Sequence, residues 1–176
     1  DVRPAYYQIM SGDVLNDIQG TINISDASEI FTRGISMNGP ATGGWVTWGA
    51  TLDGTAANKM HDDGTHGDAV AGDSIYTVQF DYEATQTIGQ EFKFGIGGGD
   101  NESGYGLNHI ENIDVTSGTV ASYWGSINPN KYSAWNYDTN MPTLSIDEIH
   151  TSLTPRHFAL SDNYPNPFNP VTSFSF

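Results

Sequence analysis

The sequence predicts an all-β protein, with a single antiparallel β-sandwich followed by an extended C-terminal arm. Three observations lead to this prediction. No segment carries a sustained three-four apolar repeat that ends in a helix cap. Only 15% of the residues are charged, which is low for helices whose surfaces are rich in Lys and Glu. Apolar segments recur roughly every 10–15 residues between turns of Gly, Asn and Asp, as in antiparallel sandwiches.

The first part of the chain is expected to hold four strands. Each has a short apolar stretch, and Gly20 inside the second is expected to form a bulge. Asn38-Gly39-Pro40 and Gly43-Gly44 indicate a loop before the fourth strand. The expected strands cover residues 4–10, 14–24, 29–37 and 45–52.

The clearest strand pattern follows an acidic, Gly-rich loop. Apolar and aromatic side chains alternate with polar ones at Tyr76, Val78, Phe80 and Tyr82. This period of two is typical of a half-buried strand. After a turn over residues 83–90, the alternation returns at Phe92, Phe94 and Ile96. Two more strands are expected, at residues 107–115 and around Leu144, Ile146 and Ile149.

Length and charge limit the possible classes of protein. The 176 residues suit one domain, which we place at residues 1–154, with the arm at 155–176. The net charge of -15 excludes a nucleic-acid-binding face, because six Lys and Arg residues cannot follow a phosphate backbone. It also argues against docking on anionic lipid. No apolar run approaches the ~18 residues of a membrane span.

Two further features of the sequence concern its environment. The absence of Cys excludes disulfides, thiolate zinc sites and Cys nucleophiles. The first residue is Asp1, not Met, so we expect that an upstream segment such as a signal peptide has been removed.

The arm combines three prolines with a short strand-like end. Pro165, Pro167 and Pro170 fix φ and lack backbone donors, which favours an extended conformation. The segment Asn163-Tyr164-Pro165-Asn166-Pro167-Phe168-Asn169-Pro170 resembles the start of the C-terminal sorting domain of proteins exported by the type IX secretion system. The resemblance implies an extracellular or bacterial cell-surface protein. The side chains expected to act in assembly are Tyr164, Phe168, Phe174 and Phe176.

The middle of the chain resembles a second family, over roughly residues 30–115. The pieces are Asn38-Gly39 with Trp45, then the loop and strand from Asp62 to Thr77, then Phe92-Lys93-Phe94. They are similar to immunoglobulin-like, early-set β-sandwich modules related to starch- and glycogen-binding modules of secreted bacterial proteins. The resemblance implies that fold and a carbohydrate ligand.

The loop at residues 61–73 is the candidate metal site. Asp62, Asp63, Asp68 and Asp73 offer the hard oxygen ligands that calcium prefers. The alternative is a tight turn in which Asp side chains accept hydrogen bonds from turn amides. His61 and His66 in the same loop are ligands that zinc would accept, and solvent-facing loop histidines are the alternative.

Aromatic side chains form the second candidate site. One interpretation is a carbohydrate site, because sugar rings stack on flat aromatic faces. The alternative is packing in a core or a subunit interface, since both also favour Trp and Tyr. Trp45 and Trp48 are three residues apart, so on a strand they would point to opposite faces. The side chains expected to be exposed for a ligand or a protein interface are Trp45, Tyr123, Trp124, Tyr132, Trp135 and Tyr137.

Two functions remain open at this point, and neither is enzymatic. No nucleophile motif surrounds Ser74, and Asp100 follows Gly97-Gly98-Gly99, where it would repel a phosphate. The first function is a secreted structural subunit that self-associates into a filament, sheath or surface layer by exchange of its arm. The second is a carbohydrate-binding module. Expected partners are therefore further copies of the chain or a polysaccharide.

Overall fold

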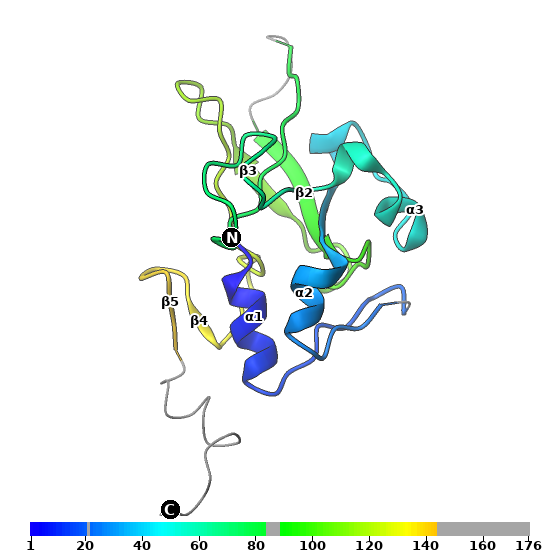
Figure 1. Cartoon of the computed structure of the whole chain (residues 1–176), viewed down its shortest axis with the longest axis vertical. Coiled ribbons are helices and arrows are strands. Elements are labelled where there is room, and N and C mark those ends of the chain that lie inside the picture. Colours follow the sequence, from blue (N-terminus) through cyan, green and yellow to red (C-terminus); the bar gives the residue numbers. More distant parts are fainter. Residues whose placement is uncertain (21, 84–88, 144–176) are drawn as a thin grey trace, which may run out of the picture. The chain divides into compact units, whose positions relative to one another are not determined.

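The structure is a computed structural model that describes residues 1–20, 22–83 and 89–143 (Figure 1). These residues belong to the first of two units of the chain, Asp1–Leu144. The expected strand around Leu144, Ile146 and Ile149 and the whole arm, with Tyr164, Phe168, Phe174 and Phe176, lie outside the described residues.

Two antiparallel sheets are present in the described part of the chain. The larger has the order β1-β2-β3, formed by Ile35–Asn38, Gly89–Ile96 and His109–Asn112. The smaller pairs β4, Trp135–Asn136, with β5, Met141–Pro142. The prediction of antiparallel pairing is confirmed, with few and short helices between the strands.

β2 is the centre of the larger sheet, and its register sorts its side chains between the two faces. Met37 of β1 lies opposite Phe94, and Phe92 lies opposite His109 of β3. Because strand side chains alternate, Phe92 and Phe94 share one face while Lys93 belongs to the other. The expected strand at Phe92–Ile96 is confirmed, and the one at 107–115 is confirmed in its central four residues.

The expected strand at residues 4–10 is wrong, because this segment is helix α1, Arg3–Met10. Pro4 stands in its first turn, where the missing amide N–H costs nothing. The buried residues Pro4, Ala5, Gln8 and Ile9 recur four apart, which is a helical and not a strand spacing. α1 therefore buries one face in the core.

The expected strand at residues 29–37 is replaced by helix α2, Ser28–Arg33, and only then by β1. Asp26 accepts a hydrogen bond from the backbone N–H of Ser28 at 2.8 Å, Glu29 pairs with Arg33 at 2.7 Å, and Gly34 ends the helix at φ 76°. An acidic start, a basic last turn and a final Gly are helix signals.

Three other expected strands are reduced to turns or single bridges. Residues 45–52 lead into the short helix α3, Ala50–Asp53, and short 3-10 helices occur at Pro40–Thr42 and Ala56–Asn58. Residues 14–24 form a single bridge, Leu15 with Ile24. The segment 74–82 forms a single bridge, Thr77 with His61.

The core lies between α1, α2 and the larger sheet. Its largest fully buried apolar side chains are Trp124, Phe92, Ile24, Ile30, Ile35, Leu52 and Ile96. Within the described residues, no helix has the length and apolar character needed to cross a bilayer.

Candidate functional site

A groove of about 740 Å³ opens over one face of the larger sheet. Its floor is formed by Ile35, Met37, Phe92 and Phe94, which alternate along β1 and β2; Met37 is partly exposed, and the other three are buried in the core. The register explains the apolar floor, because all four side chains belong to one face. The groove is large enough for an organic ligand or a peptide segment.

The first wall of the groove is the segment 75–82. In Figure 1 it follows the acidic loop as one extended pass. Thr77 exchanges two backbone hydrogen bonds of 2.8 Å with His61. Beyond it, no backbone hydrogen bond joins residues 78–82 to any other described residue. The wall therefore has the sequence of a strand and lacks the pairing of one.

The second wall is the segment 117–123. It starts at a narrow turn where Asp114 and Thr119 form a bridge. Val120 and Ala121 are exposed and make no backbone hydrogen bond within the described residues. Within the described residues, both walls thus present backbone donors and acceptors without a backbone partner, although unpaired backbone groups are the exception in folded proteins.

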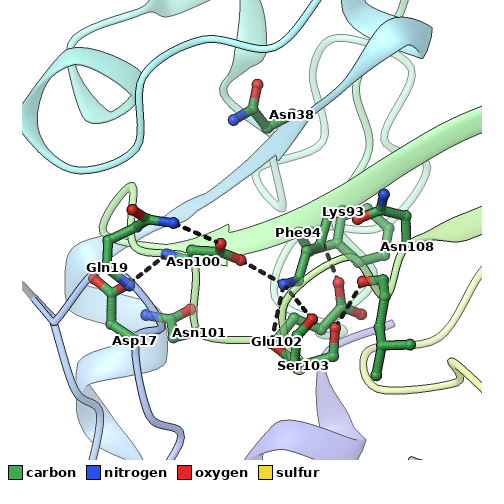
Figure 2. A network of polar contacts seen from close by, with 12 residues as sticks. Asp17, Gln19, Asn38, Lys93, Phe94, Asp100, Asn101, Glu102, Ser103 and Asn108 are labelled. Atoms are coloured by element: carbon green, nitrogen blue, oxygen red, sulfur yellow. Dashed lines mark hydrogen bonds and ion pairs between the residues drawn. The ribbon is translucent and has the colours of Figure 1, made fainter. Parts of the chain in front are cut away.

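Behind the sheet, a buried network of polar side chains fixes the segments around β2 (Figure 2). Lys93, which is 2% exposed, forms an ion pair of 2.5 Å with Asp100 and donates to the carbonyl oxygen of Ser103 at 3.0 Å. Asp100 in turn receives a hydrogen bond from Gln19 at 3.3 Å, and its backbone N–H donates to Asp17 at 3.1 Å. A buried pair of this kind needs such extra partners to offset the loss of hydration.

Glu102 joins this network to the second wall. Its carboxylate accepts hydrogen bonds from the backbone N–H of Phe94 and of Gly125, both at 2.8 Å, and from Nε2 of His109 at 2.7 Å. Because an ionised carboxylate only accepts, Nε2 of His109 carries the proton. Nδ1 of the same ring lies 3.1 Å from the hydroxyl of Ser122, which lines the groove.

Sequence reasoning missed Lys93, Asp100, Glu102 and His109. The one signal was Lys93 itself, a charged residue between two aromatic strand residues. Alternation places it on the face opposite the aromatic residues, and in this fold that face is also covered.

The predicted aromatic site is divided between core and surface. The prediction that all six side chains are exposed is wrong for Trp124 and Trp135, which are 0% and 4% exposed. The indole N–H of Trp124 donates to the hydroxyl of Tyr132 at 2.9 Å, and the hydroxyl of Tyr137 donates to the carbonyl of Trp124 at 2.8 Å. Burial of these two phenols raises the pKa of both above the ordinary value of 10.0.

The remaining aromatic side chains lie nearer the surface. Tyr123 is partly buried and meets Tyr137 edge to face at 6.5 Å. Trp45 is 47% exposed, and its ring lies 6.2 Å from that of Trp48. The two Trp residues do not point to opposite faces of a strand, because no strand forms at 45–52 in this fold. They make an aromatic pair in which Trp45 is exposed and Trp48 is half-buried.

The acidic loop turns its carboxylates toward its own amides. Asp62 accepts hydrogen bonds from the backbone N–H of Gly72, Asp73 and Ser74 at 2.7, 3.1 and 3.0 Å. Asp68 accepts from the backbone N–H of Gly64 at 2.6 Å. These bonds fit the alternative of a capped turn, in which Asp62 clasps the two ends of the loop.

The same loop brings possible metal ligands together in two groups. Carboxylate oxygens of Asp62, Asp68 and Asp73 lie within 4.8 Å of one another. Ligand atoms of His61, Asp63 and His66 form the second group, in which the two imidazole rings stack at 3.8 Å. A hydrogen bond from the Thr65 hydroxyl is the main cause that lowers the pKa of Asp63. The structure thus groups three of the four predicted carboxylates and places Asp63 with the two histidines instead, while calcium and zinc binding stay predictions.

Comparison with protein-family models, with curated proteins and with solved structures finds no match to this chain. The site is therefore interpreted from its own geometry.

Proposed function

We propose that this chain is a non-catalytic structural subunit that is secreted and associates with copies of itself in an extracellular filament, sheath or surface layer. The groove is the observation that carries the proposal. An apolar groove flanked by two segments whose backbone groups have no backbone partner among the described residues is suited to strand addition, which uses main-chain hydrogen bonds for affinity and side-chain pockets for specificity. The immunoglobulin-like sandwich, the extended arm and the location outside the cell belong to this proposal.

The arm is the element proposed to join the copies. Deletion of residues 156–176 is therefore expected to reduce the assembly to single chains, as measured by light scattering at matched protein concentrations. Electron microscopy of the intact chain is expected to show ordered polymers. An assembly of unchanged size after the deletion would contradict arm exchange.

The non-catalytic part of the proposal has its own test. Ser122, His109 and Glu102 follow one another in the order used by serine hydrolases. We assign this relay a structural role, because the His109 ring and the Glu102 carboxylate are fully buried and Glu102 also holds two backbone amides. A fluorophosphonate probe is expected to leave Ser122 unlabelled. Labelling that disappears in Ser122→Ala would make the chain an enzyme.

A carbohydrate-binding module is the second candidate function. The exposed Trp45, whose ring lies beside that of the half-buried Trp48, favours it, since a sugar ring stacks on an exposed aromatic face. Calorimetric titration with α-glucans is expected to show binding that Trp45→Ala removes, with Tyr105→Ala, also an exposed aromatic position, as the control. A screen of common polysaccharides without binding would remove this candidate.

Calcium is the proposed ion for Asp62, Asp68 and Asp73, where it would hold the loop closed and take no part in catalysis. Calorimetric titration with calcium is expected to show one site that Asp68→Asn weakens, with Asp138→Asn as an exposed control. Equal thermal stability with calcium and with a chelator would leave the carboxylates as turn caps only.

A further inference from the structure

The groove defines what its occupant must be. The partly exposed apolar side chains of its lining call for apolar side chains on one face of the occupant; they are Met37, Met60, Tyr76, Val78 and Phe80. The backbone groups of residues 78–82 and of Val120 and Ala121, which have no backbone partner among the described residues, call for an occupant with unpaired N–H and C=O groups along its edges. An uncharged β-strand meets both conditions.

One segment of the chain has this pattern. In residues 171–176 Thr172, Phe174 and Phe176 alternate with Val171, Ser173 and Ser175, so both Phe side chains fall on one face of a strand. The segment carries no charge and no Pro. The preceding residues 165–170 contain three prolines, which cannot donate to a strand ladder.

The other strand-like segment outside the described residues is less suitable. Residues 144–149 contain Asp147 and Glu148. In the groove lining Arg3 is paired with Asp1, which leaves the carboxylate of Asp81, and the chain as a whole carries a net charge of -15. Two further carboxylates beside Asp81 would be repelled, whereas residues 171–176 add none.

We infer that the groove accepts residues 171–176 of a second copy of the chain, which add as a strand with Phe174 and Phe176 against the partly exposed apolar lining. This inference rests on the proposed function and names its acceptor site. The 27 residues 144–170 that precede the segment can span up to roughly 90 Å when extended. That length is sufficient for the strand to reach a neighbouring molecule.

Cysteine cross-linking tests the inference directly, because the chain contains no Cys. One full-length variant carries Val120→Cys in the groove wall, and another carries Ser175→Cys in the segment. When the two are mixed and oxidised, we expect a disulfide between two chains, which requires Cα atoms about 4.4–6.8 Å apart. Thr51→Cys, an exposed position outside the groove, replaces Val120→Cys in the control mixture and is expected to give no such product.

Two more variants keep the test decisive. Ala121→Cys offers a second position on the same wall if Val120→Cys does not fold. Adding Phe174→Ser and Phe176→Ser to the Ser175→Cys chain is expected to slow cross-linking at least about tenfold, since each buried Phe contributes about a factor of ten or more to binding. Ser173→Thr, on the opposite face of the strand, is expected to leave the rate unchanged.

The outcomes separate this inference from the proposed function. Cross-links between chains that depend on both Phe residues support it. A chain that assembles by light scattering but forms no cross-link at either wall position overturns the inference and leaves the proposed function standing. Cross-links found only within a chain that carries both Cys residues show that the arm fills its own groove, which overturns the second copy as the donor. A chain that stays monomeric at every concentration overturns the proposed function as well.

Discussion

Glu102 gives the sharpest test of how the groove is held open. Its carboxylate is fully buried and accepts three hydrogen bonds, one from β2, one from β3 and one from the Gly125 amide behind the second wall. The substitution Glu102→Gln keeps the shape of the side chain. It replaces one acceptor oxygen with an amide nitrogen, which cannot accept a hydrogen bond.

The loss in the free energy of unfolding can be worked out from these three hydrogen bonds. A hydrogen bond to a charged group contributes about 1.5–3 kcal/mol, and a neutral one about half as much. Losing one bond and weakening the other two should lower the free energy of unfolding by about 3–6 kcal/mol. Proteins of this size unfold with about 5–15 kcal/mol in total. At a slope of about 2 kcal/mol per molar urea, the midpoint should fall by about 1.5–3 M.

Glu111→Gln is the matched control for this measurement. Glu111 also faces the His109 ring, but at 3.7 Å, and its side chain is 36% exposed. An exposed pair contributes little, so this change should alter the free energy of unfolding by less than about 0.5 kcal/mol. If urea unfolding followed by tryptophan fluorescence gave equal midpoints for the two variants, the assignment of Glu102 as the anchor of the second wall would be wrong.

The remaining predictions concern the aromatic cluster and the acidic loop. Tyr132→Phe should lower the free energy of unfolding by about 1–3 kcal/mol, because the indole N–H of Trp124 and the carbonyl of Glu102 lose their partner; an unchanged melting temperature would count against this bond pattern. Burial raises the folded-state pKa of Tyr132 and Tyr137, so their contribution to stability is complete below about pH 10 and is lost as the pH rises further; two of the nine tyrosines should therefore stay un-ionised at 295 nm until the chain unfolds. Asp62→Ala removes the acceptor of three loop amides and should speed hydrogen exchange at residues 72–74, whereas exchange at wild-type rates would show that the clasp is dispensable.

Local patterns predicted the structure where neighbours along the chain decide it. The alternation of Phe92, Phe94 and Ile96 correctly indicated a strand, because β2 pairs on both sides and buries that face. The spacing of Asp and Gly in the loop correctly indicated a tight turn with clustered carboxylates. The helix α1 was missed because its short apolar stretch suggested a strand, although Pro4 in the first turn and the four-residue spacing of buried positions favour a helix.

Long-range pairing was beyond the reach of these patterns. Lys93 alternates with buried aromatic residues and would be expected in water, yet Asp100 and the carbonyl of Ser103 satisfy it inside the protein. Glu102 and His109 are seven residues apart and meet across two chain segments. The sequence spacing of Lys93 and Asp100, or of Glu102 and His109, does not distinguish these residues from exposed polar residues. Their burial depends on which face of the sheet is covered by the loop after β2.

In the segment 74–82 the local sequence pattern and the long-range pairing disagree. Its alternation is the most regular in the chain, and yet only Thr77 finds a bridge partner within the described residues. The local sequence of this segment specifies a strand, but the structure does not pair it as one. In natural proteins such disagreements between local sequence and structure occur mainly at functional sites. The pattern of Tyr76, Val78 and Phe80 specifies a half-buried strand, and strand pairing requires a neighbour. Since the segment borders a groove with an apolar floor, a strand added from a second copy would restore agreement between sequence and structure. The mismatch therefore supports the proposed function independently of the arm.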